Sequence, residues 1–157
     1  MSQTKTLQIT TSHEFDAPAD VVWTLLEDFA QIERWWPKDE PAVSIQRVEL
    51  EGEGIGLIRH IYNHGFPAPV SERPDFQDPA NLVDRLSIVG QRPAGLLGYQ
   101  AAGRIERLPG ERSQLHYCGE FSTEPEREAE AGAFLRGAYA LMSKGLAQTA
   151  SREASAS

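Results

Sequence analysis

The sequence predicts an α+β fold, in which a curved antiparallel sheet of about seven strands carries two short helices after its first strand and a long C-terminal helix over a cavity. Three observations predict it. An alternating N-terminal segment is typical of a strand, a series of short extended segments from Val43 onward is separated by turn sequences, and a helical pattern begins at Pro125. At 157 residues we expect one domain over residues 1–150 and a flexible polar tail over 151–157.

The first strand and two helices come at the start. Residues 6–15 alternate polar and apolar, which predicts a strand. Asp16 can cap a helix whose first turn tolerates Pro18, and apolar residues then recur at helical spacing. A short second helix is predicted over residues 31–37, ending at Pro37.

Six further strands fill the middle of the chain. Gly, Pro, Asn and Asp at the breaks between segments are reverse-turn signals, and such short connections imply antiparallel pairing. A sheet of this size curls, and with a helix across its mouth it encloses volume. The predicted strands span residues 43–50, 55–62, 68–76, 82–89, 99–108 and 113–121.

The long helix is predicted from Pro125 to about Thr149, with acidic residues favourably placed near its N-terminus. Its predicted inner face provides two candidate ligand contacts, Phe134 and Leu141, beside Ala138, Met142 and Gly145. The small residues Gly137, Ala138 and Gly145 allow close backbone approach or space for a ligand, or simply pack as small residues.

Charge and motif content narrow the function classes. With 15 basic and 23 acidic residues the net charge is -8, which disfavours nucleic acid. We expect no membrane insertion and a cytoplasmic location, because no apolar stretch approaches the length of a span and the N-terminus lacks a secretory signal pattern. The four histidines have no paired ligand spacing, and phosphate-binding glycine loops are missing. No metal and no cofactor are therefore expected.

Several motifs in their order resemble one family. They are Asp16-Ala17-Pro18-Ala19-Asp20-Val21-Val22-Trp23, Phe29 with Trp35-Trp36-Pro37, Gly54-Ile55-Gly56-Leu57-Ile58-Arg59, Gly65, Val70-Ser71-Glu72-Arg73, Tyr99, Leu115-His116-Tyr117 and Gly119-Glu120-Phe121. Across nearly the whole chain, this pattern resembles the polyketide cyclase/dehydrase branch of the START-related (SRPBCC) superfamily. The resemblance implies the helix-grip fold with a ligand cavity, and a reaction only loosely, because the fold carries many functions. Pro74 and Tyr117 depart from the usual family residues.

Arg59 and Glu72 are candidate catalytic residues. They fall on neighbouring predicted strands around the His64-Gly65 turn, where side chains can pair across the sheet. Arg59 could hold an enolate while Glu72 orients it or acts as a base. The alternative is an ion pair with a structural role alone.

Tyr117 is the third candidate catalytic residue. On its strand Leu115, Tyr117, Gly119 and Phe121 form the more apolar set, so Tyr117 and Phe121 are predicted to face inward and His116 outward. Tyr117 could donate a hydrogen bond to a ligand oxygen, or be a core aromatic residue.

Further ligand contacts are expected near the cavity entrance. Tyr99 opens a strand beside the segment 90–98, whose Leu96 and Leu97 could gate the cavity or cap the core. Trp35 and Trp36 are consecutive, so one is predicted to line the cavity and the other to point away.

The predicted function is binding of a small hydrophobic or polycarbonyl organic molecule. We expect a cyclase or dehydratase that shapes its substrate and stabilises an enolate, with a homodimer left open. The alternative is a carrier or sensor of a lipid, quinone or similar apolar ligand. Two ionisable groups converging in the cavity would favour catalysis, and a uniformly apolar lining would favour carriage.

Overall fold

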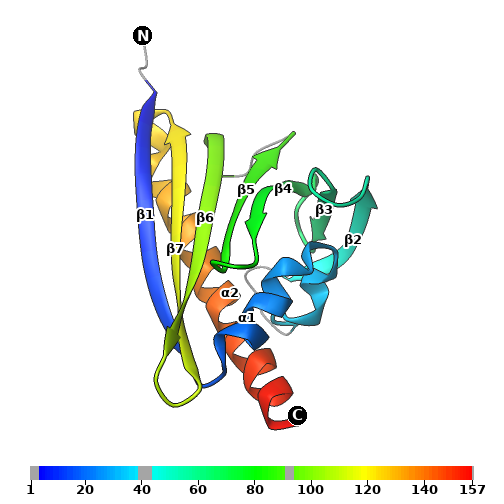
Figure 1. Cartoon of the computed structure of the whole chain (residues 1–157). Helices are drawn as coiled ribbons and strands as arrows, with labels where there is room; N and C mark the ends of the chain where they lie inside the picture. Colours follow the sequence, from blue (N-terminus) through cyan, green and yellow to red (C-terminus); the bar gives the residue numbers. More distant parts are fainter. Residues whose placement is uncertain (1–3, 39–43, 91–93, 157) are drawn as a thin grey trace.

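Seven strands form one sheet in the part of the chain that the computed structural model describes, residues 4–38, 44–90 and 94–156 (Figure 1). The α+β fold and the order of its elements are confirmed. The strands are β1 (Lys5–Phe15), β2 (Ile45–Glu51), β3 (Ile58–Asn63), β4 (Val70–Asp78), β5 (Val83–Val89), β6 (Leu96–Leu108) and β7 (Arg112–Thr123). The helices are α1 (Ala19–Glu27), the 3-10 helices η1 (Phe29–Arg34) and η2 (Pro125–Arg127), and α2 (Glu128–Ala156).

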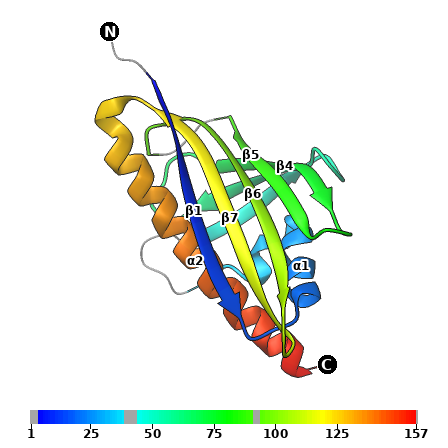
Figure 2. The same cartoon turned by 60° about the vertical axis from the view of Figure 1, so that its left-hand side comes forward.

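The sheet is an open antiparallel meander to which the first strand adds one edge. Its order is β1-β7-β6-β5-β4-β3-β2, so each strand from β2 to β7 pairs with its neighbour in sequence. β1 joins the far edge by pairing with β7 along its whole length (Figure 2). The short connections therefore give the antiparallel sheet that the sequence predicts.

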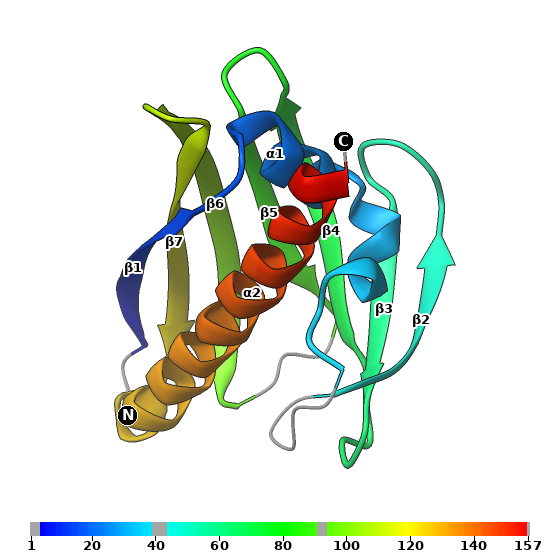
Figure 3. The same ribbon diagram turned by 90° about the horizontal axis from the view of Figure 1, so that it is seen from below.

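The long helix α2 lies across the concave side of this sheet, and α1 and η1 lie near its C-terminal part (Figure 3). Along β7, residues alternate between a buried inner set and a half-buried outer set, as the period of a strand requires. The buried face of α2 repeats every three or four residues and packs into the sheet. That face consists of Ala131, Leu135, Tyr139, Met142, Leu146 and Ala150.

A bulge in β4 accommodates the unusual proline. The register between β4 and β5 shifts between Pro74 and Phe76. Proline has no N–H to give to a ladder, and bulges are among the places where a strand tolerates it. The Pro74 carbonyl still accepts a hydrogen bond from the Gly56 amide at 3.3 Å.

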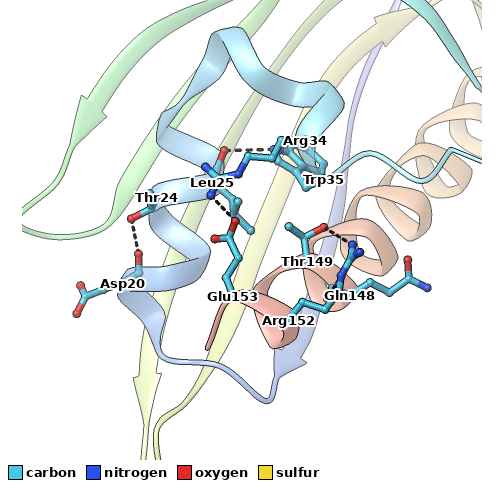
Figure 4. A network of polar contacts seen from close by, with 9 residues as sticks. All are labelled: Asp20, Thr24, Leu25, Arg34, Trp35, Gln148, Thr149, Arg152 and Glu153. Atoms are coloured by element: carbon cyan, nitrogen blue, oxygen red, sulfur yellow. Dashed lines mark hydrogen bonds and ion pairs between the residues drawn. The ribbon is translucent and has the colours of Figure 1, made fainter. Parts of the chain in front are cut away.

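Helix α2 extends beyond its predicted end near Thr149. The helix continues through residues 151–156, where the sequence predicted a flexible polar segment. Arg34 of η1 forms an ion pair with Glu153 of this last turn, and the Trp35 indole Nε1 donates to the Leu25 carbonyl at 3.2 Å close by (Figure 4). Contacts with η1 therefore hold a polar helix end that its own propensity did not predict.

Two details of the first helices also differ from the prediction. The residue that precedes α1 is Pro18 without a side-chain cap, and Asp16 instead pairs with Arg112 at 3.1 Å. The second helix begins earlier than predicted and is a 3-10 helix interrupted at Gln31. None of the helices in the described ranges is long and apolar enough to span a membrane.

Candidate functional site

A cavity of about 110 Å³ lies between the concave face of the sheet and α2. It is lined from η1 and the residues after it, from β2 to β7, and from α2. Most of the wall is apolar, as in sites for small organic molecules. The apolar lining residues are Ile32, Trp35, Trp36, Ile45, Ile61, Val70, Leu86, Ile88, Phe134, Leu135, Ala138 and Met142.

Arg59 and Glu72 form a nearly buried ion pair on the cavity wall. They are direct partners in the β3–β4 register, as predicted. The Arg59 guanidinium donates to Glu72 Oε1 from Nε at 2.9 Å and from Nη2 at 2.7 Å. Its Nη1 donates to the Phe29 carbonyl at 3.0 Å, and its plane lies 3.7 Å over the Phe29 ring. Because both contacts use Oε1, Glu72 keeps Oε2 for another hydrogen bond.

Three tyrosines from different elements meet beside this pair. The hydroxyls of Tyr99 and Tyr139 are 2.6 Å apart, and the rings of Tyr117 and Tyr139 meet edge to face at 5.0 Å. Burial raises the pKa of Tyr99 and Tyr117 well above the usual value, and that of Tyr139 to about 12. All three are therefore neutral hydrogen-bond donors at neutral pH.

Gly119 makes room for this tyrosine cluster. A side chain there would place its Cβ 1.7 Å from the Tyr139 hydroxyl and 3.2 Å from the Tyr99 ring. Because Gly119 on β7 has no side chain, Tyr139 of α2 can reach Tyr99 on β6. This explains the glycine in the Gly119-Glu120-Phe121 motif physically.

Asp84 is a buried carboxylate on the inner face of β5, two residues before Leu86 of the cavity wall. It faces Gly103 on β6, which in turn faces Tyr117 on β7, so the three form one row across the sheet. A Cβ on Gly103 would lie 2.7 Å from Asp84 Oδ1 and 3.2 Å from the Tyr117 ring. Burial raises the pKa of Asp84 to about 6, although the charge of Arg59 opposes this rise.

Seven of the predicted site residues line the cavity. They are Trp35, Trp36, Arg59, Glu72, Tyr99, Tyr117 and Phe134. The inward direction of Tyr117 is confirmed, and His116 faces outward, where it contacts Ser12 and Glu106. Both tryptophans line the cavity, so the prediction that one points away is wrong. Trp35 follows the last residue of η1, and the chain leaves helical geometry there, so helical spacing does not apply to the pair.

Leu96 and Leu97 do not line the cavity. Both belong to β6, which begins earlier than predicted, so the predicted gating segment is in part a strand. Leu96 is buried in the core, and Leu97 beside a register shift is 45% exposed. The centre of the predicted gate, residues 91–93, lies outside the described residues.

Phe121 and Leu141 are the other two predicted contacts that the cavity excludes. Phe121 is buried but borders a separate surface hollow of about 360 Å³ near the ends of β5 and β6. Leu141 is only half-buried, because the inner face of α2 is centred on Leu135, Tyr139 and Met142 instead.

Tyr139, Asn63 and Asp84 are polar residues that the sequence reasoning missed. Tyr139 stands four residues after Leu135 and three before Met142, a helical spacing that could have identified it. Asn63 and Asp84 each continue the inward set of their strand, Ile61 and Leu86 respectively, so alternation was the available signal. In the described residues, no group of three or more His, Cys, Asp or Glu gathers as metal ligands would.

Comparisons with solved structures show what the fold is similar to. Norcoclaurine synthase from Thalictrum flavum superimposes with a TM-score of 0.75 at 17% identity, over 92% of this chain and 86% of that one. The Zhui aromatase/cyclase from Streptomyces sp. R1128 gives 0.72 at 23% identity, over 92% and 94%. The protein XoxI from Bacillus cereus gives 0.76 at 22%, over 91% and 94%. At such identities the likeness shows the fold alone.

The family comparison covers most of the sequence. No curated protein matches the chain significantly. The family model described as polyketide cyclase/dehydrase and lipid transport matches residues 6–152. The fold, the curved sheet under a long helix and the internal cavity agree with that match. The chain therefore belongs to the polyketide cyclase/dehydrase and lipid transport family.

Proposed function

We propose that this protein binds a small, largely apolar carbonyl compound in its cavity and catalyses an enolate reaction of the cyclase or dehydratase type. The observation that carries the proposal is the convergence of the Arg59–Glu72 pair with the hydroxyls of Tyr99 and Tyr139 and with Tyr117 in an otherwise apolar cavity. A site that only shields a ligand needs no such group of ionisable side chains.

The residues divide the chemistry between them. Glu72 accepts the proton from the carbon next to the substrate carbonyl through its available Oε2. Arg59 and a neutral tyrosine stabilise the enolate oxygen, whose negative charge forms in a poorly hydrated site where such donors act strongly. The enolate carbon then attacks a second carbonyl of the same molecule, and a tyrosine hydroxyl supplies the proton to the new alkoxide. Protonated Glu72 returns its proton to the tyrosinate that this leaves. In a dehydration, Glu72 then removes a second proton from the same carbon, a carbon–carbon double bond forms as the carbon–oxygen bond breaks, and the hydroxyl leaves as water with a proton from the tyrosine, which recovers it from Glu72.

This mechanism needs no redox step and no bound cofactor, because it consists of proton transfers, the formation of one new carbon–carbon bond and, in a dehydration, the loss of water by cleavage of one carbon–oxygen bond. The cavity also accelerates the reaction by holding the two carbonyls close together in the orientation that the attack requires. The family match supports this chemistry.

The cavity volume sets the size of the ligand. At about 110 Å³ it is below the range of sites for drug-sized molecules. An apolar cavity of about 150 Å³ accepts benzene. The cavity as it stands is smaller than this, so we propose substrates built on no more than one ring, and even these require α2 to move slightly away from the sheet.

Deuterium exchange into phenylacetone tests the proposal, since this ketone has one ring and exchangeable protons next to its carbonyl. In D₂O the wild-type protein is expected to accelerate loss of the benzylic proton signal over buffer. Glu72→Gln should slow exchange about 100-fold, the usual minimum effect of losing a general base. Glu120→Gln, on the outer face of β7, is the matched control and should not slow it. Exchange in the wild type at the buffer rate would refute catalysis.

The carrier function is the second candidate, and one observation favours it. Arg59 is already bonded to Glu72 and to the Phe29 carbonyl, as in a structural ion pair. A carrier would bind phenylacetone without exchanging its protons. Binding by calorimetry together with an exchange rate equal to that of buffer would support this alternative.

A further inference from the structure

The side-chain oxygen of Asn63 is buried and makes no hydrogen bond within the described part of the chain. Its side chain lines the cavity at the end of β3, and only 6% of the residue is exposed. Its Oδ1 has no hydrogen-bond partner among the residues that the structure describes. An unsatisfied buried acceptor costs about 1–3 kcal/mol of stability. A hydrophobic residue would be more stable there if Asn63 served only the fold.

The position at a turn does not account for this asparagine. Asn63 is followed by the His64-Gly65 turn, and its backbone carbonyl accepts a hydrogen bond from the Phe66 amide at 3.2 Å. Asparagine is common in turns because its side-chain oxygen bonds to nearby backbone amides. Here Oδ1 makes no such bond, since the side chain belongs to the inward set of β3.

The neighbours of Asn63 on the cavity wall are apolar. Its partner across the sheet is Ile45, and the next inward residue of β3 is Ile61, which pairs with Val70. None of these side chains can donate a hydrogen bond. Because Oδ1 also has no partner elsewhere in the described part of the chain, the contents of the cavity can supply a donor for it.

The polar groups of β3 stand at its two ends. Arg59 and Asn63 are four residues apart on the same face, so their backbones are separated by about 13 Å. Ile61 and other apolar residues lie between them. A ligand that fits both ends has one polar group at each end of an apolar centre.

We infer that Asn63 is a binding subsite for a ligand hydroxyl, and that the cavity takes a single-ring compound with this hydroxyl at one end and its reacting carbonyl groups at the other. A hydroxyl fits because it both donates and accepts, so it can satisfy either atom of the amide. The carbonyl assignment at the Arg59 end rests on the proposed function, and the hydroxyl assignment rests on Asn63.

A pair of probes that differ in one hydroxyl tests the inference. Calorimetry is to compare 4-hydroxyphenylacetone with phenylacetone on the wild type, on Asn63→Leu and on Gln100→Leu. The last replaces an exposed amide on the outer face of β6 and is the matched control. The wild type and the control should bind the hydroxylated probe roughly 10-fold more tightly, which corresponds to one net hydrogen bond. Asn63→Leu should lose this preference and still bind phenylacetone.

The outcomes separate the two proposals. Equal affinity of the wild type for both probes would overturn the Asn63 subsite and leave the proposed function intact. A preference that survives in Asn63→Leu would overturn the subsite as well. Binding of neither probe to the wild type would refute both the subsite and the one-ring ligand. Because Asn63→Leu removes an unpaired buried acceptor, its melting temperature should not fall, which makes unfolding a poor explanation of a lost preference.

Discussion

Asp84→Asn should remove a loss of folding stability that the wild type shows as the pH rises. Asp84 is buried on the inner face of β5, where Arg59 provides an opposing charge and the Gly103 amide a hydrogen bond. Tyr117 lies next to it across Gly103 and cannot offset a negative charge. The folded protein therefore favours the protonated form of this carboxyl.

The size and sign of the effect follow from the pKa. Burial raises the pKa of Asp84 from 3.8 to about 6, which corresponds to about 3 kcal/mol. Between these values the folded state binds more protons than the unfolded state, so stability falls as pH rises. The contribution is fully present below pH 3.8 and is lost above pH 6. The asparagine is neutral throughout, and its oxygen can accept the same backbone hydrogen bond.

Urea unfolding at pH 4 and pH 8, followed by tryptophan fluorescence, measures the difference. Relative to the wild type, Asp84→Asn should gain about 3 kcal/mol between the two values of pH, or roughly 10 °C in melting temperature for a chain of this length. Asp28→Asn, at an exposed aspartate, controls for the loss of one negative charge. If the stability difference between Asp84→Asn and the wild type is the same at both pH values, the reasoning about Asp84 is wrong.

Two stability predictions follow from the site geometry. Glu72→Ala leaves the buried charge of Arg59 without its carboxylate and should lower the free energy of unfolding in urea by about 3–5 kcal/mol. The double variant Arg59→Met/Glu72→Leu should recover most of this loss. A loss below about 1 kcal/mol for the single variant would contradict a buried pair. Gly145→Ala would place a Cβ 2.0 Å from the Trp35 carbonyl and should destabilise by about 1–3 kcal/mol. Gly137→Ala on the exposed face of α2, where nothing lies within 4 Å, should instead stabilise slightly, and similar losses for both would refute the proposed contact.

The sheet could be predicted because its signals are local. Alternation and turn residues set the strand order, and the His64-Gly65 turn placed Arg59 opposite Glu72. Alternation likewise gave the inward direction of Tyr117. The start of β6 was missed because Leu96, Leu97 and Gly98 resemble a flexible segment and pair with β7 only through long-range contacts.

The inner face of α2 was harder to predict. Alanine and glycine occur all round this helix, so the apolar period is weak and the predicted face shifted toward Leu141. The true face depends on which residues approach the sheet and η1. Tyr139 was missed for the same reason, since its place depends on space left by Gly119 on a distant strand. Contacts of this kind join residues that are far apart in the sequence, so a short stretch of sequence does not reveal them.

The central claim is that the cavity under α2 binds the ligand, and filling the cavity tests it most directly. Ala138 lines the cavity, whereas Ala140 of the same helix is exposed. Calorimetry with phenylacetone is therefore to compare the wild type with Ala138→Phe and Ala140→Phe. The account predicts that the wild type and Ala140→Phe bind and that Ala138→Phe does not. Binding to Ala138→Phe with unchanged affinity would place the ligand outside the cavity and contradict the account.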